Sequence, residues 1–291
     1  MITTLQGKAY GKINIGLDVL RKRNDGYHEV KMIMQTVSLY DRITITRHKN
    51  SSGIVLETNL NFLPTNENNI VYKAAKLLKD EFGLSDGLSI KLEKHIPVAA
   101  GMAGGSTDAA TTLELINTMY SLNLSKEDLM KRAVTLGADV PYCILKGTAL
   151  CEGIGEILTP IKPLMPCYIL IVKPPIYVST KFVYEHLKIN ELKSHPDIDG
   201  IVSAISAGNL ETMSQKMGNV LEFVTENNYP VISSIKKLMI QNGAISSLMS
   251  GSGPTVFGIY DDEEKINQAA TFFKTNYPSY RTYVTKPINN S

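Results

Sequence analysis

The sequence has no tryptophan, only three cysteines and almost no excess of either charge, and the small charge and the few cysteines each argue against a class of function. The formal net charge is +2, and the longest basic run, Arg21-Lys22-Arg23, is followed at once by Asn24 and Asp25. A nucleic-acid-binding protein usually concentrates its basic residues in one patch. We therefore expect no nucleic-acid partner.

The three cysteines are an odd number, and no two of them stand at CxxC spacing (Cys143, Cys151 and Cys167). This pattern argues against a disulfide framework and a zinc site, and it fits the reducing cytoplasm. Four of the histidines also lack metal-ligand spacing (His48, His95, His186 and His195). We expect a cytoplasmic protein without a resident metal.

Long apolar runs are absent too, since none approaches the roughly 18 residues that a membrane-spanning helix needs. The first eight residues show neither an apolar signal core nor an arginine-rich transit pattern. We expect no membrane association. What is present is the composition of a globular protein, 43% hydrophobic and 20% charged, in a chain of 291 residues that can form one large domain or two.

The order of predicted elements indicates an α+β fold. Apolar alternation predicts strands at 13–17, 43–45 and 89–96, and spacing of three and four predicts helices at 69–82, 107–120 and 125–137. After a buried strand at 167–172 we expect helices at 201–217 and 229–242, strands at 246–249 and 255–260, and a helix at 263–276. The boundary between two domains, 1–162 and 163–291, is placed in the proline-containing stretch 160–166.

A glycine-rich loop lies between a predicted strand and a predicted helix. It comprises Pro97, Val98, Ala99, Ala100, Gly101, Met102, Ala103, Gly104, Gly105, Ser106 and Thr107. Small residues let the backbone approach a ligand closely, and the helix start supplies N–H groups and a positive dipole end for a phosphate. The alternative, a tight turn that needs glycine only for its geometry, has about even odds from the loop alone.

The familiar phosphate motifs do not account for this loop. No lysine follows Gly105, which excludes GxxxxGK[ST], and Gly101 is followed by Met102 and Ala103, which excludes GxGxxG. The HRD and DFG signatures of protein kinases are missing as well. If the loop holds a triphosphate, it belongs to another family.

Three segments resemble the motifs of the galactokinase, homoserine kinase, mevalonate kinase and phosphomevalonate kinase (GHMP) superfamily, in the order of those motifs. They are 9–17 (AYGKINIGL), 97–108 (PVAAGMAGGSTD) and 248–258 (LMSGSGPTVFG). The resemblance implies an ATP-dependent small-molecule kinase. It also implies an N-terminal domain like ribosomal protein S5 domain 2 and a ferredoxin-like C-terminal domain. Ala103 departs from a glycine common in the family, which we expect to stiffen the loop slightly.

Two further segments, 23–29 (RNDGYHE) and 136–141 (LGADVP), resemble one branch of the superfamily. Its members act in the non-mevalonate isoprenoid pathway, on a cytidine-diphosphate-linked methylerythritol. The implied reaction transfers the ATP γ-phosphate, with ATP as the Mg²⁺ complex, to the 2-hydroxyl of that alcohol. The alternatives are a GHMP kinase for another small alcohol and a non-catalytic nucleotide-binding module.

The resemblance implies that Asp139 is the catalytic base and Lys12 its partner. Phosphoryl transfer needs a group that orients or deprotonates the attacking hydroxyl, and an ammonium can offset charge on the transferring phosphoryl. Without the resemblance, Asp139 would be a structural cap and Lys12 an edge-strand lysine.

Four side chains are candidates for binding the substrate. Asn14 shares a strand face with Lys12 because the two are one strand period apart. Tyr27 and His28 follow a turn, where the tyrosine can stack on a pyrimidine and the histidine can bond its edge. Tyr177 is a weaker candidate for the second face of the ring, and a strand-start tyrosine is an equal alternative for it. An unliganded loop histidine is the alternative for His28.

The run 250–253 (SGSG) is a second segment of exposed N–H groups, which we assign to closing the site near the phosphates through Gly251 and Ser252. A plain inter-strand turn is the alternative. Magnesium is expected to arrive on the nucleotide, because no carboxylate cluster marks a dedicated cage. We expect a monomer or a weak homodimer.

Overall fold

The structure is a computed structural model that describes residues 3–192 and 194–289. It contains mixed helix and sheet, so the predicted α+β class is confirmed. The chain forms two compact units. The first comprises 1–11, 39–98 and 103–145, and the second comprises 12–38, 99–102 and 146–291. Each unit is built from three separate stretches of the sequence, because strands β1 (Thr4–Lys22) and β2 (His28–His48) each contribute residues to both units.

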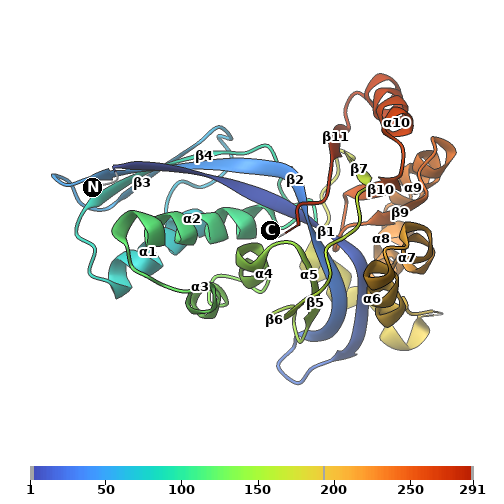
Figure 1. The fold of residues 1–291 in the computed structure, drawn as a ribbon, viewed down its shortest axis with the longest axis horizontal. Coiled ribbons are helices and arrows are strands. Elements are labelled where there is room, and N and C mark those ends of the chain that lie inside the picture. Colours follow the sequence, from blue (N-terminus) through green and yellow to red (C-terminus); the bar gives the residue numbers. More distant parts are fainter. Residues whose placement is uncertain (1–2, 193, 290–291) are drawn as a thin grey trace. The chain divides into compact units, whose positions relative to one another are not determined.

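The first unit is a sheet with helices along one face (Figure 1). Residues 42–48 of β2 pair antiparallel with β4 (Gly87–Glu93), which pairs parallel with β3 (Ile54–Thr58). Helices α1 (Ile70–Glu81) and α2 (Gly104–Tyr120) pack on each other, and α3 (Lys126–Ala133) and α4 (Val140–Leu145) follow. The alternating buried residues of the strands and the apolar stripe of α1 form its core.

The second unit holds a four-stranded antiparallel sheet in the order β11-β7-β10-β9. Its strands are β7 (Tyr168–Lys173), β9 (Ser246–Met249), β10 (Val256–Tyr260) and β11 (Arg281–Thr285). Helix α9 (Val231–Gln241) lies between β7 and β9 in the chain, and α10 (Glu263–Asn276) lies between β10 and β11. This β-α-β-β-α-β order is the ferredoxin-like arrangement that the family resemblance implies.

The remaining elements of the second unit include two short pairings on β1 and β2. Residues 32–35 of β2 pair with β5 (Thr148–Glu152), which pairs with β6 (Ile157–Pro160), and β1 pairs with β8 (Gly218–Asn219) at Gly16 and Leu17. The other helices are α5 (Thr180–His186), η1 (Ile189–Glu191), α6 (Ile198–Ala207), α7 (Leu210–Lys216) and α8 (Glu222–Asn228).

Two predicted helices were wrong in extent, and the helix predicted at 125–137 ends at Ala133 in the structure. The pattern predicts a single helix over 201–217, whereas the structure has α6 and α7. Gly208 ends α6 in the left-handed conformation at φ +70°, and the Asn209 side chain caps α7 by accepting from the Thr212 N–H.

The predicted boundary between residues 162 and 163 lies inside the second compact unit. The two-domain division at that point stays a prediction. None of the described helices is long and apolar enough to cross a membrane.

Candidate functional site

The glycine loop joins β4 to α2 and bends through three residues with left-handed backbone. Ala99, Gly101 and Ala103 have φ values of +50°, +70° and +54°. An L-residue other than glycine pays roughly 1–2 kcal/mol for this conformation. The two alanines therefore hold strain, and Ala103, the departure from the family pattern, holds it directly before the first residue of α2.

In the second unit, the middle of this loop lies against the loop that follows β9. A Cβ on Gly101 would stand 2.0 Å from the Ser250 carbonyl oxygen, so no residue with a side chain fits there. The Ser250 hydroxyl donates to the Gly101 carbonyl at 2.8 Å. The two predicted glycine-rich segments are thus neighbours, and the contact itself requires glycine.

Lys12 and Asn14 lie beside this junction on β1. The Lys12 ammonium donates to the Asn14 side-chain oxygen at 2.6 Å, and the Lys12 N–H donates to the Met102 carbonyl at 3.1 Å. The Asn14 oxygen lies 3.6 Å from where a Cβ on Gly251 would be. Lys12 is buried, with 5% of its surface exposed, so the alternative of an exposed edge-strand lysine does not hold. A buried ammonium beside an amide oxygen and two glycine loops is suited to binding an anion.

Ser252 is tied to the same neighbourhood. Its hydroxyl lies 2.8 Å from the Thr180 hydroxyl at the start of α5, and its carbonyl accepts from the Thr225 hydroxyl at 3.3 Å. Ser252 is nearly fully buried. Residues 250–253 do lie in the turn between the antiparallel strands β9 and β10, and they are buried there; their role in closing the site stays a prediction.

Tyr27 and His28 follow the turn between β1 and β2. Tyr27 is 61% exposed, while His28 is partly buried, with its ring 5.2 Å from the ring of Tyr184 on α5. Partial burial and the nearby charge of Lys22 lower the pKa of His28, so the ring is mostly neutral at pH 7 and offers one donor and one acceptor.

A cavity of about 490 Å³ adjoins His28. It is lined by Leu20, Arg21 and Lys22 from β1 and by the segment 187–191 that follows α5. Tyr177, the predicted second aromatic, is 69% exposed in the segment between β7 and α5. Sequence reasoning missed Tyr184, because the local pattern of α5 does not show which residue outside the helix its ring contacts.

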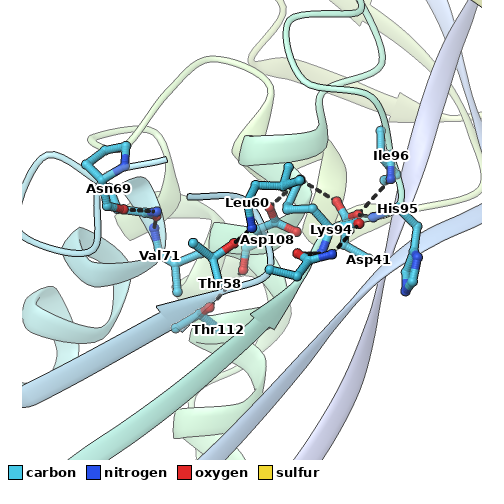
Figure 2. Close-up of polar contacts among 12 residues, drawn as sticks. Asp41, Thr58, Leu60, Asn69, Val71, Lys94, His95, Ile96, Asp108 and Thr112 are labelled. Carbon is cyan, nitrogen blue, oxygen red and sulfur yellow. Dashed lines mark hydrogen bonds and ion pairs between the residues drawn. The ribbon is translucent and has the colours of Figure 1, made fainter. Parts of the chain in front are cut away.

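In the first unit, the start of α2 lies over a buried ion cluster that sequence reasoning also missed (Figure 2). The Lys94 ammonium contacts Asp108 of α2 at 2.6 Å and is also paired with Asp41 of β2. Asp41 accepts from the Ile96 N–H at 2.8 Å. A Cβ on Gly104 would stand 3.1 Å from the Lys94 nitrogen, so the cluster borders the glycine loop.

The cluster holds two carboxylates and one ammonium, all with less than a tenth of their surface exposed. Burial raises the pKa of Asp108 well above its ordinary range, against the pull of Lys94. Burial alone would lower the pKa of Lys94, but the two carboxylates outweigh it and raise that pKa. One oxygen of Asp108 has no hydrogen-bond partner within the described chain. Asp108 therefore takes up a proton more readily than an ordinary aspartate, and the cluster lies next to Gly104 of the glycine loop.

Asp139 lies in the first unit directly before α4, and its carbonyl accepts from the Cys143 N–H at 3.1 Å. Asp139 therefore precedes a helix, whereas the pattern predicts that it follows the helix at 125–137, which ends at Ala133 in the structure. Among residues 3–192 and 194–289, no group of three or more histidine, cysteine, aspartate or glutamate side chains is placed to hold a metal ion.

Comparison with known proteins places these features in a family. The model described as "GHMP kinases N terminal domain" matches residues 69–147, and the one described as "GHMP kinases C terminal" matches 201–279. The chain is 57% identical over 279 residues to a 4-diphosphocytidyl-2-C-methyl-D-erythritol kinase of Lachnoclostridium phytofermentans. It is 53% identical over 279 residues to one of Lachnospira eligens. Each alignment covers 96% of both chains.

A solved structure of a 4-(cytidine 5'-diphospho)-2C-methyl-D-erythritol kinase superposes with a TM-score of 0.85 at 30% identity, covering 98% of this chain and all of the other. Homoserine kinase from Cytophaga hutchinsonii superposes with a TM-score of 0.77 at 18% identity, covering 98% of this chain and 95% of the other. The second likeness shows the shared fold.

Proposed function

The chain belongs to the GHMP kinase family, and from that premise we propose that it phosphorylates the 2-hydroxyl of 4-diphosphocytidyl-2-C-methyl-D-erythritol with ATP. The observation that carries the proposal is the cluster in which Lys12 and Asn14 lie beside Gly101 and Gly251. The identity to kinases named for that substrate supports the choice of alcohol.

In the proposed reaction, the substrate hydroxyl oxygen attacks the γ-phosphorus, and the bond from that phosphorus to the bridging oxygen of ADP breaks. Asp139 takes the hydroxyl proton. Lys12 offsets the negative charge that spreads over the transferring phosphoryl group, and Asn14 orients the ammonium by accepting a hydrogen bond from it.

The phosphates are assigned to the glycine loop and the N-terminal end of α2. ATP binds as its Mg²⁺ complex, with the metal carried by the nucleotide and its waters.

The cytosine is assigned to the aromatic residues around His28. Tyr177 stays a candidate for the second aromatic partner of Tyr27, and Tyr184 is added as a candidate because its ring lies 5.2 Å from the ring of His28. Arg21 and Lys22, on the wall of the adjoining cavity, supply positive charge for a diphosphate.

A direct assay tests the proposal. The purified chain is supplied with MgATP and, in separate reactions, with 4-diphosphocytidyl-2-C-methyl-D-erythritol, mevalonate, homoserine or galactose, and ADP release is measured. We expect turnover with the first alcohol alone. Turnover of another alcohol with none of the first would refute the substrate assignment, and no ADP release with any of them would favour a binding module.

A further inference from the structure

Two side chains outside the family-like motifs hold the backbone of residues 249–253, which we call the 249–253 loop. The Asn219 side-chain nitrogen donates to the carbonyls of Met249 and Gly251, both at 2.8 Å. The Glu222 carboxylate accepts from the Met249 N–H, also at 2.8 Å. Three hydrogen bonds from the β8–α8 segment therefore fix the first half of this loop.

Both side chains are themselves fixed. The Asn219 side-chain oxygen accepts from the Leu221 N–H at 3.0 Å. The NH₂ group of the amide therefore faces the 249–253 loop, and its oxygen faces the neighbouring backbone at Leu221. The second Glu222 oxygen pairs with Lys236 of α9 at 2.6 Å, and Lys236 also contacts Glu226 at 2.8 Å. Burial raises the pKa of Glu222 despite the opposing effect of Lys236. The two side chains are nearly buried and can move little.

The 249–253 loop needs accurate placement because it packs closely against Gly101. The Ser250 carbonyl lies where a Gly101 side chain would begin, and a Cβ on Gly251 would stand 3.2 Å from the Gly101 carbonyl. A shift of a few tenths of an ångström would bring the two glycine loops into collision or open a gap beside Asn14.

The direction of one N–H group follows from these bonds. In a trans peptide the carbonyl and the following N–H point in opposite directions. Holding the Gly251 carbonyl on Asn219 therefore points the Ser252 N–H in the opposite direction within the peptide plane, away from Asn219. An N–H fixed in this way can stabilise charge on a phosphoryl oxygen without reorganisation during the reaction.

We propose that Asn219, supported by Glu222, is a positioning residue for phosphoryl transfer, acting through the Gly251–Ser252 peptide. This inference rests on the proposed function, since it assigns the loop to the phosphoryl group. It predicts an effect on the chemical step rather than on substrate affinity, because neither side chain contacts a substrate in this mechanism.

The first test is the kinetics of Asn219→Leu, which removes both donations at similar volume. We expect kcat to fall by about tenfold to a hundredfold, with KM for ATP and for the alcohol changed by less than about threefold. Glu222→Leu should also lower kcat, and Glu222→Gln should lose less because an amide oxygen still accepts from the Met249 N–H.

Asn117→Leu is the matched control. Asn117 bonds the backbone of Leu124 through both atoms of its amide, at 3.0 and 3.1 Å, and so braces a loop in the same manner elsewhere. We expect wild-type kcat for this variant. If Asn219→Leu keeps wild-type kcat, or loses no more than Asn117→Leu, the positioning role is refuted.

Amide hydrogen exchange without substrate separates this inference from the proposed function. Exchange at residues 249–253 should quicken in Asn219→Leu and stay unchanged in Asn117→Leu. A wild-type chain that does not turn over the alcohol would refute the proposed function. Unchanged exchange at 249–253 would refute the bracing itself, whatever the wild-type activity. If Asn219→Leu does not fold, Asn219→Asp gives the same two readouts, since it keeps the shape and removes the donors.

Discussion

Lys12 illustrates how a single residue gains its meaning from its surroundings. On the strand pattern alone it is a lysine among small and apolar residues, and an exposed edge position explains it equally well. In the structure it is 5% exposed and donates to Asn14. A buried ammonium is costly unless it is compensated, which is reason to expect a functional role for it.

Lys12→Met should lower kcat by at least about a hundredfold, because the charge that offsets the transferring phosphoryl is lost. Asp139→Asn should lower kcat to a similar degree, since the amide cannot take the proton. Steady-state kinetics with saturating MgATP measure both effects. Lys8→Met is the control on the same strand, where the lysine is exposed over the Tyr40 ring, and should keep wild-type kcat. Unchanged kcat in either test variant contradicts its assigned role.

Gly101→Ala should abolish most activity and destabilise the fold. The added methyl group would meet the Ser250 carbonyl at 2.0 Å, in addition to the strain of φ +70°. Gly208→Ala is the matched control, because Gly208 has the same φ of +70° and no atom within 4 Å of the added methyl group. We expect Gly208→Ala to cost about 1 kcal/mol of unfolding free energy and no activity. Equal effects of the two changes on urea denaturation and kcat would mean that the close approach of the loops is unimportant.

At the scale of elements, the Asp41–Lys94–Asp108 cluster joins β2, the residue that follows β4, and α2, and it lies next to Gly104. In the sequence, Asp41 lies 53 residues and Asp108 lies 14 residues from Lys94. The helix and strands could each be predicted from periodicity. Their meeting at one lysine could not, because nothing in a local pattern shows which charged residues face each other.

The raised pKa of Asp108 makes a pH-dependent contribution to stability. A carboxyl whose folded-state pKa exceeds its ordinary value of 3.8 stabilises the fold fully below that value, and the contribution is lost as pH rises through the folded-state pKa. Asp108→Asn cannot ionise. We therefore expect the unfolding free energy of Asp108→Asn, relative to wild type, to increase between pH 5 and pH 8 in urea titrations.

Asp80→Asn serves as the control, because Asp80 forms an exposed ion pair with Lys76 on α1. Its effect should be within about 1 kcal/mol and the same at both pH values. If the difference in unfolding free energy between Asp108→Asn and wild type stays constant across this range, the pKa of Asp108 is not raised in the folded state.

Element prediction was most accurate where caps and periodicity agreed. The helix at 263–276 was predicted at the bounds that α10 has, and the helix predicted from residue 125 begins at Lys126, where a capping box between Ser125 and Asp128 fixes its start. Three short helices, α4, α5 and α8, were missed because six or seven residues give too few turns for a periodic signal. Strands β1 and β2 run for 19 and 21 residues, well beyond the short apolar cores that the pattern shows.

At the scale of the whole molecule, the expected dependence on magnesium can be tested by removing the metal. Dialysis against EDTA should abolish kinase activity, and added Mg²⁺ should restore it fully, because the ion enters with ATP. Elemental analysis of the dialysed protein before this addition should find no stoichiometric metal. Retention of one metal per chain after dialysis would instead indicate a protein-held site.

The oligomeric state stays a prediction of a monomer or a weak homodimer, and sedimentation over a range of concentrations checks it. The domain division is also a whole-molecule property. A single cut near residue 162 follows from composition, whereas the compact units are discontinuous because two long strands take part in both. Composition along a chain reports local preferences and does not show which distant segments pack together.

The glycine-rich segments were determined by the sequence itself, since backbone freedom and exposed N–H groups are properties of the residue types at those positions. The α+β class and the family followed from local periodicity and from motifs in order, and both are confirmed. Only the tertiary structure decided that Gly101 needs glycine because of Ser250, that the Tyr184 ring lies beside His28, and that Asn219 and Glu222 hold the 249–253 loop. These are contacts between segments far apart in the chain, and their energies depend on distances that no local pattern encodes.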